Sequence, residues 1–182
     1  MGFKEAFAHK GIMEHSLRPF LGENSELFIY IVIAAMLPVA VGNQLVVGTA
    51  VNALLILSAL HFRGWKPLLL IFFPSIFAFL FSSILLGETH FLAYLLPPIW
   101  VGNAIIVVAF KVFVAENKGY WETLLKAALL KAGVIGASAL ALIWAGFVPA
   151  AMLLPMSALQ FVTAMLGGIS AYALRSAILG WK

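Results

Sequence analysis

The sequence predicts an all-α, polytopic membrane protein with six transmembrane helices and both termini in the cytoplasm. Hydrophobic residues make up 64% of the 182 residues, charged residues make up 10%, and the mean hydropathy is +1.08. A soluble domain has roughly 45–50% apolar and about 25% charged residues, so this chain has too few charges to cover a water-soluble surface. The composition excludes soluble enzymes, nucleic-acid-binding modules and disordered regulators.

Residues 1–26 differ from the rest of the chain and form a separate predicted segment. Charged residues are frequent here, and between them apolar residues recur at helix-like spacing: Phe3, Phe7, Met13, Leu17 and Phe20. This pattern predicts an amphipathic helix that lies on the membrane surface. A disordered tail is the alternative interpretation.

Residues 27–182 form the predicted transmembrane domain. A spanning helix needs about 20 residues, so this apolar range holds about six helices. We place them at 27–41, 44–61, 67–87, 95–115, 123–147 and 154–178. The boundary between the first two predicted helices rests on Pro38 and on the sequence Val41-Gly42-Asn43-Gln44. These are the residues within 27–61 that could interrupt a helix.

The basic residues support an even number of spans. In the six-span arrangement all eleven Lys and Arg residues fall on the side of the termini, and the opposite connections carry none. Lys and Arg are enriched in cytoplasmic loops, so both termini are expected in the cytoplasm of a multi-pass protein of the cell membrane. Lys131 falls inside the fifth predicted helix. It is either a residue that snorkels to the inner interface or a deep anchor for a ligand.

The sequence lacks the residue types and spacings that are typical of catalytic sites and of metal sites. Cys and Asp are absent, and no Glu lies in the middle of an apolar run. The four His residues lie in the N-terminal segment or at predicted helix ends, without the spacing of metal ligands. No Ser has a His or Lys base at suitable spacing. We therefore expect no catalytic residue, no metal site, no cofactor and no enzymatic activity.

Neutral polar side chains within the apolar helices are the candidate functional residues. Burying an amide without a partner costs on the order of 2–7 kcal/mol, so each one must find a partner inside the bundle. They either join helices through hydrogen bonds or line a pocket for a small polar ligand. Asn43, Asn103 and Gln160 each follow a proline at a similar spacing, and with Gln44 they are expected at one depth, toward the outer side of the membrane. Trp100 beside them is either a pocket wall or an interfacial residue. The candidate substrate-binding residues are Asn43, Gln44, Asn52, Trp100, Asn103, Gln160 and Thr163.

Small residues are concentrated in the last two predicted helices. The fifth helix carries Gly133 and Gly136, and the sixth carries Gly167 and Gly168, each among several alanines. Faces of small residues allow helices to approach closely. They either pack within the bundle or form a docking surface for another membrane subunit.

Several segments resemble one family of small membrane proteins: GTAVNALLILSAL (48–60), FFPSIFAFLFSSILLG (72–87), LPPIWVGNAIIVVAF (96–110), AALLKAG (127–133) and ALQFVTAMLGGISAYAL (158–174). The chain is similar, from about residue 27 to the end, to the substrate-binding S components of energy-coupling-factor (ECF) transporters. The resemblance is closer to a subgroup of uncharacterised members sometimes labelled as hydrogenase-associated.

The resemblance implies a function. S components are six-helix bundles that bind one vitamin or metal-related micronutrient from outside. They release the ligand inward after docking on an ECF transmembrane coupling subunit. Two ATPase subunits drive this coupling subunit. The chain has no nucleotide-binding loop, so active uptake would need these partners. The alternative function is a structural membrane subunit or assembly factor of a larger complex.

Overall fold

The computed structural model describes residues 22–86, 91–116 and 118–179, and these residues form α-helices, two 3-10 helices and connections, without a strand. The α-helices are α2 (Glu23–Ala40), α3 (Gln44–His61), α4 (Phe73–Leu86), α5 (Phe91–Ala115), α6 (Tyr120–Trp144) and α7 (Ala158–Leu179). The 3-10 helices are η1 (Lys66–Ile71) and η2 (Ala150–Met152). The prediction of an all-α fold is confirmed.

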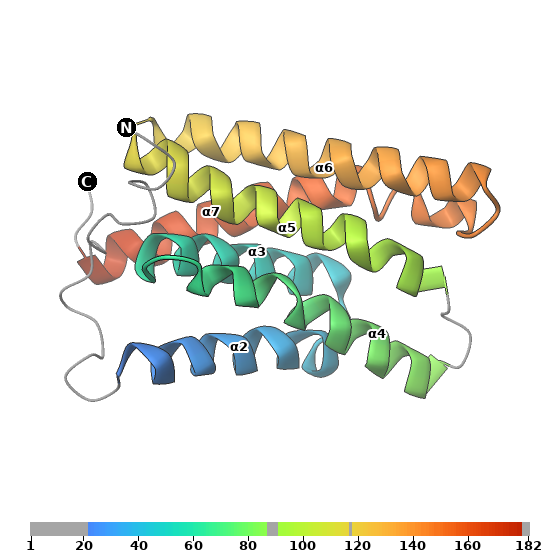
Figure 1. Ribbon diagram of the computed structural model, residues 1–182, viewed down its shortest axis with the longest axis horizontal. Helices are drawn as coiled ribbons and strands as arrows, with labels where there is room; N and C mark the ends of the chain where they lie inside the picture. Colours follow the sequence, from blue (N-terminus) through green and yellow to red (C-terminus); the bar gives the residue numbers. More distant parts are fainter. Residues whose placement is uncertain (1–21, 87–90, 117, 180–182) are drawn as a thin grey trace.

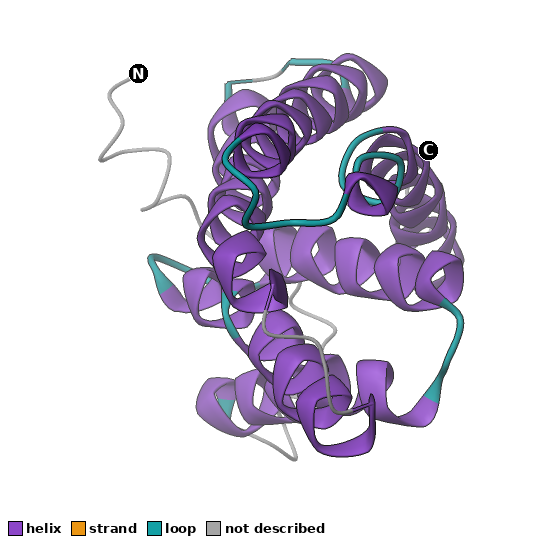
Figure 2. Cartoon of the chain, turned by 90° about the vertical axis from the view of Figure 1, so that its right-hand side faces the viewer, coloured by secondary structure: helices purple, strands orange, loops and turns teal. Residues whose placement is uncertain are grey.

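The helices run side by side in alternating directions, so the two ends of the described chain lie at the same end of the bundle (Figure 1). We call this the terminal end. It also carries the connections from α3 to η1 and from α5 to α6. The opposite, distal end carries the connections from α2 to α3 and from α6 to α7, and it faces the viewer in Figure 2.

Within the described residues, three helices are long and apolar enough to cross a membrane: α3, the Phe91–Val112 part of α5, and α6. Two further apolar segments are shorter, namely Asn24–Ala40 and Lys66–Phe81. These helices indicate a membrane protein, in agreement with the composition.

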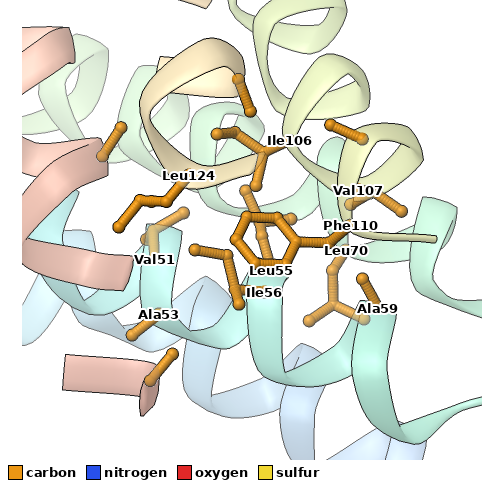
Figure 3. Close-up of a cluster of buried hydrophobic side chains, with 14 of the residues drawn as sticks. Val51, Ala53, Leu55, Ile56, Ala59, Leu70, Ile106, Val107, Phe110 and Leu124 are labelled. Atoms are coloured by element: carbon orange, nitrogen blue, oxygen red, sulfur yellow. The ribbon is translucent and has the colours of Figure 1, made fainter. Parts of the chain in front are cut away.

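The apolar core lies between α3, η1, α5 and α6 toward the terminal end. Side chains from all four elements meet there, among them Leu55, Leu70, Phe110 and Leu124 (Figure 3). A second, smaller apolar cluster joins the distal halves of α5 and α6 to the connection that precedes α7, through Leu95, Ile135 and Met156. Helix α3 is central, because it packs against α2, α5 and α7.

The observed boundaries match the predicted range for α3, 44–61, and differ for the other five predicted helices. Helix α5 begins at Phe91 rather than at residue 95, and α6 covers Tyr120–Trp144 rather than 123–147. Helix α2 begins at Glu23 rather than at residue 27, so the end of the predicted surface segment belongs to the bundle; residues 1–21 of that segment lie outside the described residues. Helix α7 begins at Ala158 instead of residue 154, after a run of turns.

The third predicted helix, 67–87, is interrupted. A 3-10 helix ends at Ile71 and α4 begins at Phe73. Pro74 lies just after this break and has no N–H group, so a continuous α-helix would lack its hydrogen bond to the carbonyl of Leu70. Pro74 therefore fits the first turn of α4 better than the interior of one continuous helix.

A buried ionisable pair lies at the terminal end. Nε2 of His61, at the end of α3, lies 2.7 Å from Oε2 of Glu26, near the start of α2, and both residues are buried. The ring of Tyr30 stacks parallel to that of His61, with the ring centroids 6.4 Å apart. This pair ties α2 to α3.

Candidate functional site

Lys131 lies at the middle of α6 and points into the bundle, where only 2% of its surface is exposed. Its Nζ donates hydrogen bonds to Oδ1 of Asn52, at 2.6 Å, and to Oδ1 of Asn103, at 2.8 Å. These two amides come from the middles of α3 and α5. The three candidate membrane spans, α3, α5 and α6, thus each contribute one residue near the middle of the helix to a polar cluster.

The two amides are also held by their nitrogen atoms. Nδ2 of Asn52 donates to the carbonyl oxygen of Gly48, at 2.8 Å, and to Oγ1 of Thr163 on α7, at 3.3 Å. Nδ2 of Asn103 donates to the carbonyl oxygen of Ile71, at 3.2 Å. Both amide oxygens therefore face the ammonium group, and their orientation is set before any ligand enters.

The break between η1 and α4 is part of this site. Asn103 binds the Ile71 carbonyl at the end of η1, and Oγ of Ser75 donates to the Phe72 carbonyl, at 3.0 Å. Irregular backbone at membrane depth is tolerated where protein groups satisfy it or where it lines a cavity. Here two side chains satisfy it, and one of them also binds Lys131.

Glycines bring the contributing helices close together. A Cβ at Gly167 of α7 would lie 2.6 Å from Cβ of Asn52 and 2.7 Å from the carbonyl oxygen of Thr49, both on α3. A Cβ at Gly102 of α5 would lie 3.1 Å from Cγ of Lys131. The polar cluster therefore depends on the close approach of α3 to α7 and of α5 to α6.

The cluster borders a cavity of about 560 Å³ that extends toward the distal end. Small-molecule sites commonly occupy about 300–1,000 Å³, so the volume suits a small organic ligand. Most of the wall is apolar, with side chains such as Val51, Phe79, Leu96 and Met156. The polar side chains of the lining are Gln44, Asn52, Ser75, Asn103, Lys131, Gln160 and Thr163.

The structure brings five of the seven predicted site residues to this cavity: Gln44, Asn52, Asn103, Gln160 and Thr163. Gln160 is half-buried, and its Nε2 donates to the carbonyl oxygen of Pro155, at 3.3 Å. The alternatives of packing and pocket lining are not exclusive for Asn52 and Asn103, since both bind neighbouring helices and also line the cavity.

Asn43 and Trp100 do not line the cavity. Oδ1 of Asn43 accepts hydrogen bonds from the backbone N–H groups of Leu45 and Val46, so this side chain caps the start of α3. Nε1 of Trp100 donates to Oγ of Ser75, at 2.8 Å, and the indole packs edge-on against Phe72. Trp100 thus supports a lining residue from behind.

Two of the polar lining residues were absent from the predicted set, Lys131 and Ser75. The sequence placed Lys131 within a helix but left snorkelling and anchoring open. The structure shows the side chain buried among three helices, which excludes snorkelling. A single lysine in the middle of an apolar helix is the feature of the sequence that could have identified Lys131 as a site residue. No comparable signal distinguished Ser75 from the other serines.

The small-residue faces mainly pack inside the bundle. Gly136, Gly167 and Gly168 are buried, and a Cβ at Gly168 would overlap the side chain of Leu124. Gly133, Ala137 and Ala141 are exposed, and they follow one another at intervals of four residues along α6. Internal packing therefore explains most, but not all, of these residues.

Comparison with known proteins gave no relative: no protein-family model, no curated protein and no solved structure matches this chain.

Proposed function

We propose that this protein is a six-span substrate-binding subunit for the uptake of a small micronutrient, such as a vitamin or a vitamin precursor. The observation that supports the proposal best is the cavity of about 560 Å³, which borders preoriented polar groups at the middle of three candidate spans. Polar groups at membrane depth are costly and are found mainly where they serve transport or ligand binding. The sequence resemblance to S components agrees with this function.

The expected test is ligand-dependent stabilisation of the purified protein. In detergent, one member of a micronutrient panel is expected to raise the melting temperature, because a ligand that binds the folded state stabilises it. Gln160→Leu should remove most of this shift while changing the melting temperature of the unliganded protein little, since Gln160 makes one long hydrogen bond to the backbone.

Asn43→Ala is the matched control for this experiment. The loss of a helix cap lowers stability by about 1 kcal/mol, but Asn43 lies outside the cavity lining, so the ligand-induced shift should persist. If no panel member shifts the melting temperature and the protein carries no small molecule, the structural-subunit alternative is favoured instead.

The proposed topology has six spans, with the terminal end in the cytoplasm and the cavity approached from outside. In the described residues, Arg63, Lys66, Lys111, Lys118, Lys126 and Arg175 all lie in the half of the bundle nearer the terminal end, whereas Lys131 lies at the cavity. The excess of basic residues at cytoplasmic ends supports this orientation.

Cysteine labelling tests the topology. The chain contains no cysteine, so single cysteines can be introduced without a background. Ala150, at the distal end, and Lys118, at the terminal end, are both exposed. In intact cells, Ala150→Cys should react with a membrane-impermeant maleimide, and Lys118→Cys should react only after lysis. Labelling of Lys118→Cys in intact cells would contradict the orientation.

Energy for uptake would come from partners, an ECF transmembrane coupling subunit with its two ATPases. The sequence contains no nucleotide-binding loop, which supports a need for such partners. The exposed stripe of Gly133, Ala137 and Ala141 on α6 suits close approach by a helix of another subunit.

A further inference from the structure

Among the residues that the structure describes, the cavity lining contains a cationic side chain and no acidic one. Lys131 is the one charged residue in the lining, and within the described part of the chain no Glu borders the cavity. Asp is absent from the whole sequence. The buried acid of the described chain, Glu26, is paired with His61 at the terminal end and is not part of the lining.

The hydrogen bonds of Lys131 leave room for one more acceptor. An ammonium group has three N–H donors, and Nζ uses two of them for Oδ1 of Asn52 and Oδ1 of Asn103. The amide nitrogens of both asparagines are engaged elsewhere. The third N–H donor of the ammonium group is therefore available to an acceptor atom of a molecule in the cavity.

An uncompensated charge in a low-dielectric site is costly, and an anionic partner with good geometry offsets that cost. A single cation is balanced by a single negative charge, which favours a monoanion over a phosphate dianion. The apolar walls suit a largely hydrophobic body, and Gln44 and Gln160 provide neutral hydrogen-bonding groups for its polar substituents.

We infer that the ligand of this cavity is a small organic acid whose one carboxylate pairs with Nζ of Lys131 between Asn52 and Asn103. This inference rests on the proposed function, and it specifies the chemical class of the substrate. The carboxylate would lie deepest, at the middle of the bundle, and the hydrophobic body would extend toward the distal end.

The experiment compares matched acids and primary amides by thermal shift on the purified wild-type protein. The pairs are nicotinate and nicotinamide, biotin and biotinamide, lipoate and lipoamide, and indole-3-acetate and indole-3-acetamide. Decanoate and decanamide form a further pair. This pair shows whether the cavity takes a fatty acid from the membrane or a water-soluble acid. In parallel, a denatured extract of the protein is analysed by mass spectrometry for a bound compound.

The wild-type protein is expected to be stabilised by the acid and not by the amide of at least one pair, or to carry about one equivalent of a carboxylic acid. For that acid, Lys131→Met should weaken binding by about 30-fold or more, because loss of one partner of a buried charge pair costs at least about 2 kcal/mol.

Asn103→Asp is the second variant, and it provides a test of the carboxylate site if Lys131→Met does not fold. It places a carboxylate where Oδ1 now lies 2.8 Å from Nζ, at the loss of the 3.2 Å bond to Ile71. The internal counter-ion should abolish binding of the acid while the protein remains folded. Asn43→Asp adds the same charge outside the cavity and should leave binding unchanged.

The outcomes separate this inference from the proposed function. Preference for an amide, or a neutral compound in the extract, would overturn the carboxylate assignment but leave the binding function in place. Undiminished acid binding by folded Asn103→Asp would also overturn it. A protein that binds neither member of any pair and carries no compound would overturn both. Binding of decanoate alone would support the carboxylate and identify a lipid-derived acid.

Discussion

Gly167→Ala should be strongly destabilising, by about 2–3 kcal/mol, at the upper end of the range for overpacking a well-packed interior. The added Cβ would lie 2.7 Å from the carbonyl oxygen of Thr49 and 2.9 Å from the backbone nitrogen of Ala53. Backbone atoms of α3 cannot rotate away as a flexible side chain can, so α3 and α7 would have to separate. The measurement is the free energy of unfolding in mixed micelles titrated with sodium dodecyl sulfate.

Gly133→Ala is the matched control on α6. A Cβ at Gly133 meets no atom within 4 Å, and the residue is exposed. This change should leave stability unchanged or raise it by up to about 1 kcal/mol, the gain in helix propensity from glycine to alanine. Equal effects of the two substitutions would show that close packing of α3 on α7 does not limit stability.

The separation of α3 from α7 should also reach the polar cluster. Gly167 faces Cβ of Asn52, and Asn52 joins Thr163 to Lys131. Ligand binding is therefore expected to weaken in Gly167→Ala even in the fraction that remains folded. Helix packing and the geometry of the site are coupled here through a single residue.

The helices could be predicted from the sequence because they depend on local properties. Apolar length and turn residues place α3 at 44–61, and Asn43 ends the preceding connection as a helix cap. The interruption at Phe72 could not be located in the same way. Proline occurs inside α2, at Pro38, and inside α5, at Pro97 and Pro98, without ending either helix. A proline alone therefore did not mark Pro74 as the site of a break.

The site could be predicted only in part, and the reason is again physical. Amides in an apolar sequence must find partners, which identified Asn52 and Asn103 as candidates. Whether Lys131 reaches an interface or a cavity depends on which face of α6 is turned toward α3 and α5. That face is set by contacts such as the one between Gly102 and Ile135, which join distant parts of the sequence.

Asn103→Leu should destabilise the unliganded protein by about 2–3 kcal/mol, because a hydrogen bond to a charged group contributes about 1.5–3 kcal/mol. The substitution leaves the buried ammonium of Lys131 with Asn52 as its remaining acceptor, and it also removes the bond to the carbonyl of Ile71. The free energy of unfolding is measured as for Gly167→Ala.

The same substitution should be much less harmful when Lys131 is absent. In Lys131→Met, Oδ1 of Asn103 has no ammonium to accept from, so the further change to Leu removes mainly the 3.2 Å bond to Ile71. Replacing both partners of a buried hydrogen bond by apolar groups is often nearly neutral. The cost of Asn103→Leu should therefore fall to about 1 kcal/mol, with a coupling energy of about 1–2 kcal/mol, within the usual range for residues in contact. Additive costs in the double variant would mean that Lys131 and Asn103 are neighbours without a stabilising hydrogen bond, and the cavity would then lack the preoriented cation on which the proposed substrate class depends.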